Sequence, residues 1–463
     1  MSNKFRTIFF SAIVILFLLV TPSVIFYSLG YRIDFNSKKI IKTGAFYFKV
    51  WPRGAEIFFD GKSKKKTDFL LGSAYISDLL PKTYKVEIKK EGFLTWQKNL
   101  EIKENEVTEA KNVFLIPANP RLSSIDKEVE DFLFSPDGKS VVLKKTGEDG
   151  WSLEFLNLET DLKTEVFSEK TRVELVNLEF SFDSGNLLLE TREKNKTNYL
   201  VLELEKTPIN KIPLDFLGSG VKKNFFDPDD NQTIFIFREE KGVNYLYKTD
   251  LTTKKVSSQP ILKDFLIYDA TAKDLFFIRN DGFLFRTDFL GNNQEKLSQT
   301  PILIQKESSG EDKILSDNST IFLLNKGDLY LLDSESKEFK NISENINNLE
   351  FSPDGKKLFF ANNYEVWILF LEKKYDQPQK EALDQLFLTR FSERIDRIFW
   401  YTSGYLIFNV GNKIKTAEID NRDKINIFDL ADFNNPKVFF NQYNKKLYIL
   451  SDNNFLSSDK LLP

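Results

Sequence analysis

The sequence predicts an all-β protein that begins with one transmembrane helix and continues as two β-sheet regions. Twenty uncharged and mostly apolar residues, 8–27, stand close to the N-terminus. Short runs of alternating apolar and polar residues fill most of the remaining chain, and one turn motif recurs at a regular spacing. No sustained 3.6-residue apolar period is present outside the first segment, which argues against a repeat built from helices.

Composition restricts the chemistry that this chain can perform. Its 463 residues suggest two or three domains, and 65 Lys and Arg against 68 Asp and Glu do not favour a nucleic-acid partner. The chain has no His and no Cys, which excludes Ser-His-Asp and Cys-His catalysis, thiol redox chemistry, disulfides and the usual zinc, haem and iron–sulfur sites. We therefore predict no catalytic, cofactor-binding or metal-binding residues and no cofactor.

The first element is expected to be a transmembrane helix over 8–29, after a cytoplasmic tail at 1–7. Twenty apolar residues at about 1.5 Å each span roughly 30 Å of hydrocarbon. Lys4 and Arg6 precede the segment with no acid, which favours a cytoplasmic N-terminus and an extracytoplasmic remainder. A cleaved signal peptide is the alternative because 28–30 offers small residues, but the apolar run is longer than the roughly 7 to 15 residues of a signal sequence.

Residues 43–117 are expected to form a small antiparallel β domain. Short alternating apolar runs are separated there by Pro and Gly. Asp60-Gly61 predicts a tight hairpin, because Asp and Gly tolerate the positive φ angles that such a turn requires.

This region resembles a PEGA domain. The resemblance departs from the family at Arg53, where the signature has Glu, and at 82–83, where Gly is usual. It implies an extracytoplasmic spacer or adhesion module of a prokaryotic surface or envelope protein, without catalytic residues. The matching segments are VWPRGA (50–55), IFFDGK (57–62), LLP (79–81) and YKVEIKKEGF (84–93).

Charge is distributed unevenly along the chain. Residues 1–117 contain 19 Lys and Arg and 11 Asp and Glu, a net charge of +8, whereas 118–463 contains 46 and 57, a net charge of −11. A cationic region beside a bilayer is attracted to anionic headgroups or wall polymers. For Lys62 and 64–66 the preferred interpretation is a solvated hairpin tip.

The remaining 346 residues contain a repeat. Phe134–Lys139, FSPDGK, recurs unchanged as Phe351–Lys356, and each copy precedes a β-rich run. With weaker copies, eight units of about 43 residues are counted. Units of this length with three or four strands predict a β-propeller at 118–463 with about eight blades, seven being possible. The weaker copies lie at 180–185, 225–230, 275–279, 321–324, 405–408 and 446–450.

The repeat resembles the WD40-like unit of TolB-type and dipeptidyl-peptidase propellers, which carries Ser-Pro-Asp-Gly-Lys before a strand. The motif is expected to form a turn, so it implies architecture and no activity. The last unit lacks an outer strand. We expect Val113–Leu122 to supply this strand and to close the ring.

Candidate sites are few. Asp227–Asn231 could offer oxygen ligands to Ca²⁺ but lacks the Gly and the distant Glu of an EF-hand loop, so turn formation is the preferred interpretation. The five Trp residues could stack on carbohydrate, although their positions in strand runs favour core packing. They are Trp51, Trp96, Trp151, Trp367 and Trp400.

Together these features predict a non-catalytic, single-pass membrane protein of the prokaryotic cell envelope with most of the chain outside the cytoplasm. It is expected to act as a binding or scaffold protein whose propeller face takes an envelope protein or a cell-wall polysaccharide. Two alternatives remain: a carboxylate-based glycan hydrolase, which would need two acids about 5 to 10 Å apart, and an envelope sensor.

Overall fold

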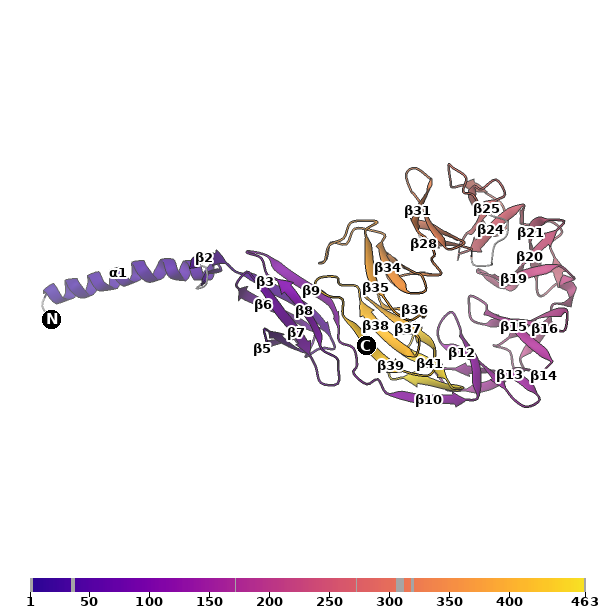
Figure 1. Ribbon diagram of the computed structural model, residues 1–463, viewed down its shortest axis with the longest axis horizontal. Helices are drawn as coiled ribbons and strands as arrows, with labels where there is room; N and C mark the ends of the chain where they lie inside the picture. The colour runs from indigo at the N-terminus through magenta and orange to yellow at the C-terminus, as the bar shows by residue number, and fades with distance from the viewer. Residues whose placement is uncertain are drawn as a thin grey trace.

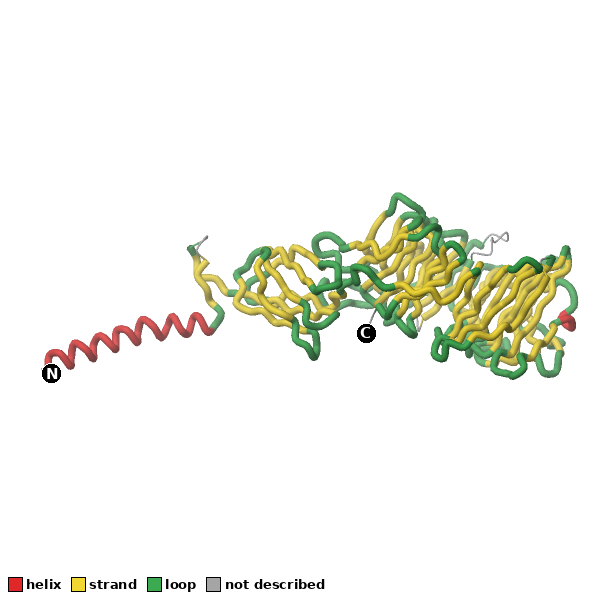
Figure 2. The backbone as a smooth tube through the Cα atoms, turned by 90° about the horizontal axis from the view of Figure 1, so that it is seen from below, coloured by secondary structure: helices red, strands yellow, loops and turns green. Residues whose placement is uncertain are grey.

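The computed structural model describes residues 3–34, 38–170, 172–271, 273–304, 312–317 and 320–461. One long helix, a small β module and a ring of sheets follow one another along the longest axis of the molecule (Figure 1). Figure 2 shows the same order after rotation by 90°, with strands in both the module and the ring.

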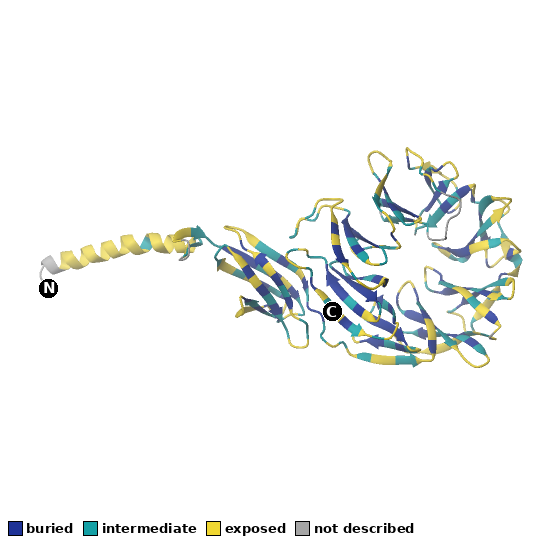
Figure 3. Cartoon of the chain, viewed as in Figure 1, coloured by how far each residue is buried: buried dark blue, intermediate teal, exposed yellow. Residues whose placement is uncertain are grey.

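Helix α1, Asn3–Ser28, carries exposed apolar side chains between Ile8 and Tyr27 (Figure 3). Its segment Arg6–Ser28 is long and apolar enough to cross a membrane, as expected. The helix begins inside the predicted tail 1–7, of which residues 1 and 2 lie outside the described chain. It ends where Gly30 takes a φ of +82°, a conformation that favours glycine.

A short hairpin that was not predicted follows the helix. Strands β1, Tyr31–Asp34, and β2, Lys39–Lys42, pair in antiparallel register. Arg32 binds Asp78 of the module at 2.5 Å and donates to the carbonyl of Tyr27 at 2.7 Å, so one side chain joins the end of the helix to the module.

The module consists of seven strands in two sheets around one apolar core. The sheets have the orders β6-β3-β9 and β5-β4-β7-β8, and Phe46, Phe48 and Phe59 are at the centre of the core. The strands are β3 (Gly44–Trp51), β4 (Glu56–Phe59), β5 (Lys62–Lys66), β6 (Ser73–Leu79), β7 (Thr83–Lys89), β8 (Trp96–Glu101) and β9 (Val107–Phe114).

The Asp60-Gly61 hairpin is confirmed, because β4 and β5 pair across it and both residues have positive φ angles, 50° and 78°. The expectation of an entirely antiparallel module is wrong. Strand β9 runs parallel to β3. The chain adds β4 and β5 to the other sheet, returns to pair β6 with one edge of β3, and then adds β7 and β8 to the other sheet. It finally crosses back to the opposite edge of β3, and such a crossover allows parallel pairing.

The rest of the described chain forms eight sheets arranged in a ring (Figure 1). Seven sheets are built from strands consecutive in sequence. They comprise β11 (Val129–Phe134), β12 (Ser140–Thr146), β13 (Gly150–Asn157) and β14 (Lys163–Lys170); β15 (Val173–Phe180), β16 (Asn186–Glu193), β17 (Lys196–Glu203) and β18 (Asn210–Pro213); β19 (Val221–Asp227), β20 (Asp230–Glu240), β21 (Val243–Asp250), β22 (Lys255–Val256) and β23 (Leu262–Lys263); β24 (Phe265–Ala270), β25 (Leu275–Arg279), β26 (Leu284–Thr287) and β27 (Glu295–Lys296); β28 (Lys313–Asp317), β29 (Thr320–Asn325), β30 (Asp328–Leu332) and β31 (Phe339–Ser343); β32 (Asn348–Phe351), β33 (Lys357–Ala361), β34 (Glu365–Phe370) and β35 (Gln385–Arg390); and β36 (Ile395–Thr402), β37 (Tyr405–Val410), β38 (Lys413–Glu418) and β39 (Ile427–Asp432). In Figure 1 the labelled first strands β15, β19, β24, β28 and β36 lie toward the centre of the ring.

The ring is closed by hydrophobic contacts. Eight apolar clusters of described residues each combine side chains from two neighbouring sheets, and two of these clusters join the final sheet to the sheets on either side of it. A closed ring of sheets that pack face to face is a β-propeller. The predicted all-β class and the propeller-like architecture are therefore confirmed.

The final sheet contains strands from both ends of the propeller. Strands β40 (Lys437–Asn441), β41 (Lys446–Ser451) and β42 (Asn454–Ser458) are completed by β10 (Leu122–Lys127), which pairs with β42. An N-terminal strand thus closes the ring as expected, but its position was predicted wrongly. Val113 belongs to the core of the module, so the closing strand begins only at Leu122, the last residue of the predicted segment.

The repeated Ser-Pro-Asp-Gly motif forms one kind of turn. The Ser135 hydroxyl donates to Asp137 at 2.7 Å and accepts the backbone N–H of Ser140 at 3.0 Å. Ser352 makes the equivalent contacts with Asp354 at 2.5 Å and Lys357 at 3.0 Å. The serine therefore ties the end of one strand to the start of the next, which agrees with the structural interpretation of the motif.

Candidate binding cleft between the module and the propeller

The module contacts the propeller through a buried lysine. The Lys98 side chain on β8 is 0% exposed, and its ammonium group lies 2.8 Å from the Glu418 carboxylate at the end of β38. The same ammonium group donates to three backbone carbonyls of the loop between β38 and β39. These belong to Asp420, Arg422 and Lys424, at 2.8, 2.9 and 2.7 Å.

Glu418 is the second half of this junction. Its carboxylate accepts the Trp96 indole N–H at 2.7 Å and the Asn426 backbone N–H at 3.0 Å. Burial raises the pKa of Glu418, and the charge of Lys98 opposes that rise. A buried pair of this kind holds the two parts in one geometry, because separating them would leave a charge without a partner.

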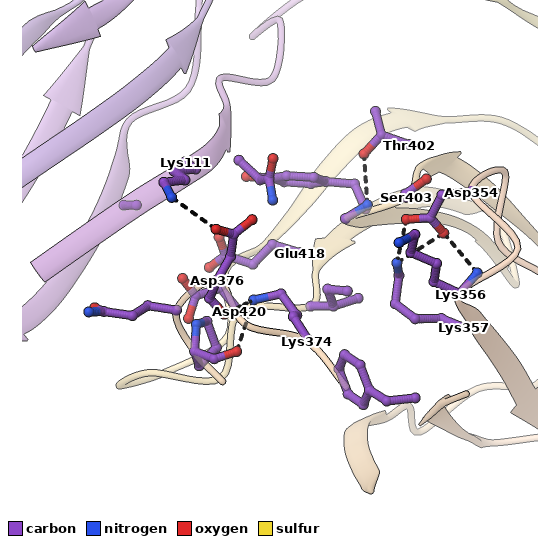
Figure 4. Close-up of a pocket in the computed structure, with 18 of the residues that line it drawn as sticks. Lys111, Asp354, Lys356, Lys357, Lys374, Asp376, Thr402, Ser403, Glu418 and Asp420 are labelled. Atoms are coloured by element: carbon purple, nitrogen blue, oxygen red, sulfur yellow. Dashed lines mark hydrogen bonds and ion pairs between the residues drawn. The ribbon is translucent and has the colours of Figure 1, made fainter. Parts of the chain in front are cut away.

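A cleft of about 640 Å³ opens beside this junction. One wall is β9 of the module, and the other is formed by turns and loops of the sheets β32–β35 and β36–β39. Figure 4 shows Lys111 of the module directed toward Asp376 of the propeller, at 2.9 Å. The charged residues that line the cleft are Lys111, Lys356, Lys357, Lys373, Lys374, Arg422, Asp354, Glu372, Asp376, Glu418 and Asp420.

Opposite charges are paired along the walls of the cleft. Lys357 contacts Asp354 at 2.8 Å, and Arg422 contacts Asp420 at 2.6 Å. Arg422 also donates to the Glu109 carbonyl of the module at 2.6 Å. The cleft therefore presents alternating charges beside apolar surface from residues such as Phe370.

Lys374 is a base in the cleft whose pKa lies below its ordinary value. Burial lowers its pKa to about 8, and the positive charges of Arg422 and Lys357 act in the same direction. Its ammonium group donates to the carbonyls of Asp376 and Pro378, at 2.7 and 2.8 Å. The cleft consequently loses one positive charge as the pH rises through about 8.

We expect amine acylation to detect this shift. At pH 8 about half of the Lys374 side chains are neutral, whereas an ordinary lysine with a pKa of about 10.4 is almost entirely charged. Peptide mass spectrometry after brief acylation from pH 6 to 10 should show a midpoint near 8 at Lys374. Lys374→Arg serves as the control, since its spectra must lack this modification. A midpoint above 10 would show that the amine is solvated.

A second group of charged residues lies on inner strands of the propeller. Burial raises the pKa of Glu179 on β15 to about 6 and also raises the pKa of Asp269 on β24. Lys223 on β19, between these two sheets, lowers the pKa of both acids through its charge. The positive charge of Lys223 therefore offsets only part of the cost of burying the ionised carboxylates of Glu179 and Asp269.

Glu350 on β32 gives a prediction about stability. Neighbouring protein atoms partly desolvate its carboxyl group and raise its folded pKa from 4.5 to about 7, although the residue is exposed at its surface. The folded protein therefore binds more protons than the unfolded chain between these values, and the effect on stability is expected to be small because solvent reaches the side chain. Stability is therefore lost as the pH rises from 4.5 to 7. Glu350→Gln should unfold at the same urea concentration as the wild type below pH 4.5 and at a higher concentration at pH 8. Equal urea midpoints of Glu350→Gln and the wild type at pH 8 would contradict the raised pKa of Glu350.

The candidate residues that the sequence suggested lie outside this cleft, with one exception. Asp227 is buried and accepts the Asp229 N–H at 3.0 Å while contacting Lys248 at 2.7 Å, as a turn residue does. Trp96, Trp151 and Trp400 are buried, which agrees with packing. The exception is Trp96, which also binds Glu418 across the junction. The charged residues of the cleft were not identified from the sequence.

Comparison with known proteins gives no family. No family model and no curated protein matches the chain. Similar solved structures include Kluyveromyces lactis Hsv2 with its complete loop 6CD, at 10% identity and a TM-score of 0.42, covering 67% of this chain and 100% of that one. The computationally designed protein Ika8 has 9% identity and a TM-score of 0.43, with coverage of 73% and 97%. The β-propeller domain of Myceliophteria thermophila Cps50 (Swd1) is 10% identical with a TM-score of 0.38, and the match covers 72% of this chain and 96% of that one.

Proposed function

We propose that this chain is a non-catalytic binding protein of the prokaryotic cell envelope, anchored by α1 with its propeller outside the cytoplasm. In this proposal residues 43–117 are a PEGA-like spacer domain and 118–463 are an eight-bladed propeller. The ligand is an envelope protein or a cell-wall polysaccharide, and it binds the propeller face that contains the cleft.

The observation that carries the proposal is the buried junction at Lys98. A flexible linker would let the propeller rotate freely relative to the module. The buried ion pair fixes the orientation of the propeller instead, because three carbonyls accept from Lys98 and two N–H groups donate to Glu418. Fixed orientation serves a protein that presents one face to a partner at a set distance from the membrane. The net charges of +8 before residue 118 and −11 after it are consistent with a module close to an anionic membrane surface and a propeller farther from it.

Protease treatment of intact cells that express the full chain tests the topology. The propeller should be digested while a fragment containing α1 stays in the membrane. Protection of the propeller until the cells are permeabilised would reverse the orientation. A photo-crosslinking side chain at Tyr375, an exposed residue of the cleft, should then capture the ligand. The same group at Leu162, an exposed residue remote in sequence, is the control.

One observation favours a second candidate, a glycan hydrolase. Glu179 and Asp269 are two acids with raised pKa values that share Lys223, and carboxylates alone can cleave glycosidic bonds. Hydrolysis of an envelope polysaccharide that is abolished by Glu179→Gln and by Asp269→Asn would support this candidate. Activity retained in both variants would remove it.

A further inference from the structure

A loop of the module exposes three large apolar side chains. The loop Asp68–Gly72 connects β5 to β6, and within it Phe69, Leu70 and Leu71 are 83%, 75% and 70% exposed. Consecutive side chains of this size on the surface mark an interaction site more often than chance exposure does.

The loop is held in this shape by Asp68. One carboxylate oxygen accepts the backbone N–H groups of Leu70 and Leu71, at 2.9 and 2.6 Å. The other accepts the N–H of Ser73 at 2.7 Å and also the Ser73 hydroxyl. These hydrogen bonds hold the pKa of Asp68 well below its ordinary value. The apolar side chains are therefore directed outward by a formed turn.

Gly72 adds a steric constraint to the same loop. Its φ is +69°, and a Cβ at this position would lie 2.4 Å from the carbonyl oxygen of Val50. The loop consequently packs its backbone against β3 while its apolar side chains remain in solvent.

Basic residues lie directly beside the apolar loop. All five residues of β5, KSKKK at 62–66, are exposed, and Lys66 leads through Thr67 into Asp68. Tyr75 on the adjoining strand β6 is also exposed. Lysines that flank exposed aromatic and leucine side chains form the pattern of surfaces that bind an anionic membrane interface.

The position of this edge in the fold supports a membrane as the occupant. Strands β5 and β6 form one edge of the two module sheets, and β8 and β9 form the opposite edge, which contacts the propeller. Figure 1 shows β5 and β6 on the side of the module nearer to α1. The basic and apolar edge therefore faces away from the propeller. Asp78 near one end of β6 binds Arg32 beside the anchor, and the apolar loop precedes the other end of β6, where Gly72 pairs with Val50.

We propose that this edge binds the surface of the bilayer that α1 crosses. Phe69, Leu70 and Leu71 enter the boundary between headgroups and acyl chains, and the lysines of β5 contact anionic headgroups. The inference rests on the proposed membrane anchor and adds a second contact to it. With two contacts, the module cannot swing freely about the end of α1.

The absence of native cysteine permits a direct test with single labels. The full chain carrying Leu70→Cys or Leu71→Cys, labelled with an environment-sensitive fluorophore, is reconstituted through α1 into vesicles with 30 to 40 mol% phosphatidylglycerol, roughly enough for a strong negative surface potential. We expect a blue-shifted emission and at least twofold quenching by nitroxide-bearing lipids. Leu162→Cys, at a residue 67% exposed on the propeller, is the matched control and should show neither effect.

Further arms separate the possible sources of failure. Lys64→Glu combined with Lys65→Glu should reduce the lipid quenching at residue 70, and vesicles of neutral phosphatidylcholine should do the same. If the label at residue 70 behaves like the label at 162 in chains that float with the vesicles, the proposed membrane contact is wrong. The edge would then be available to a protein partner, and the membrane anchor would still be supported. If the chains do not float, the anchor itself fails.

Discussion

Replacing Lys98 with methionine should destabilise the contact between module and propeller by about 3 to 5 kcal/mol. Methionine fills much of the same space but leaves the Glu418 carboxylate and three carbonyls without their donor inside a buried junction. Because Trp96 donates to Glu418, its fluorescence should report separation of the two parts, at a lower urea concentration with Lys98→Met than without it. The measurement uses a chain in which the other four tryptophans are replaced by phenylalanine.

Two variants control for this result. Lys111→Met removes a partly exposed ion pair with Asp376 across the same cleft, and it should cost less than about 1 kcal/mol because solvent screens such pairs. Adding Glu418→Gln to Lys98→Met removes the uncompensated charge and should restore part of the lost stability. Equal effects of Lys98→Met and Lys111→Met would show that the junction is wet and contributes little.

Ending the chain after Asn453 should destroy the cooperative unfolding of the propeller. This truncation deletes β42, which pairs with β10 on one side and with β41 on the other, and it therefore opens the ring at its closing sheet. Urea unfolding followed by circular dichroism should change from one steep transition to a broad decline, because the remaining sheets no longer form a closed ring that unfolds as one unit.

Single substitutions support the same test without a deletion. Phe455 on β42 is fully buried and lies 5.1 Å from the Phe132 ring of the neighbouring sheet, so Phe455→Ala should cost about 3 to 5 kcal/mol. Phe387 on β35 is half exposed, and Phe387→Ala should cost far less. A truncated chain that still unfolds in one steep transition would contradict closure by β10 and β42.

Local signals in the sequence explain why the propeller could be predicted. The Ser135 and Ser352 turns use only side chains of the motif and the backbone N–H of the residue that follows it, so both copies make the same hydrogen bonds. The Asp60-Gly61 hairpin is local in the same sense. By contrast, the closing strand depends on where the module ends. The packing of Val113 in the core of the module decides that point, and the single sequence does not show it.

The junction and the cleft could not be predicted because their parts are remote in sequence. Lys98 and Glu418 are separated by more than 300 residues, and nothing in either local pattern connects them. One signal was available. Lys98 stands between Trp96 and Leu100 at alternate positions of one strand, which places a lysine on the buried face. A charge at such a position requires a partner from another part of the chain.

The buried junction is expected to hold the propeller in one orientation relative to the module, and a distance measurement tests this most directly. Spin labels on Glu104→Cys in the module and Glu205→Cys in the propeller, both at exposed positions, allow the distance between them to be measured by pulsed electron paramagnetic resonance. We predict one narrow distance distribution for the otherwise native chain in vesicles, and a broad one when Lys98→Met is added. A broad or bimodal distribution without Lys98→Met would contradict a fixed orientation.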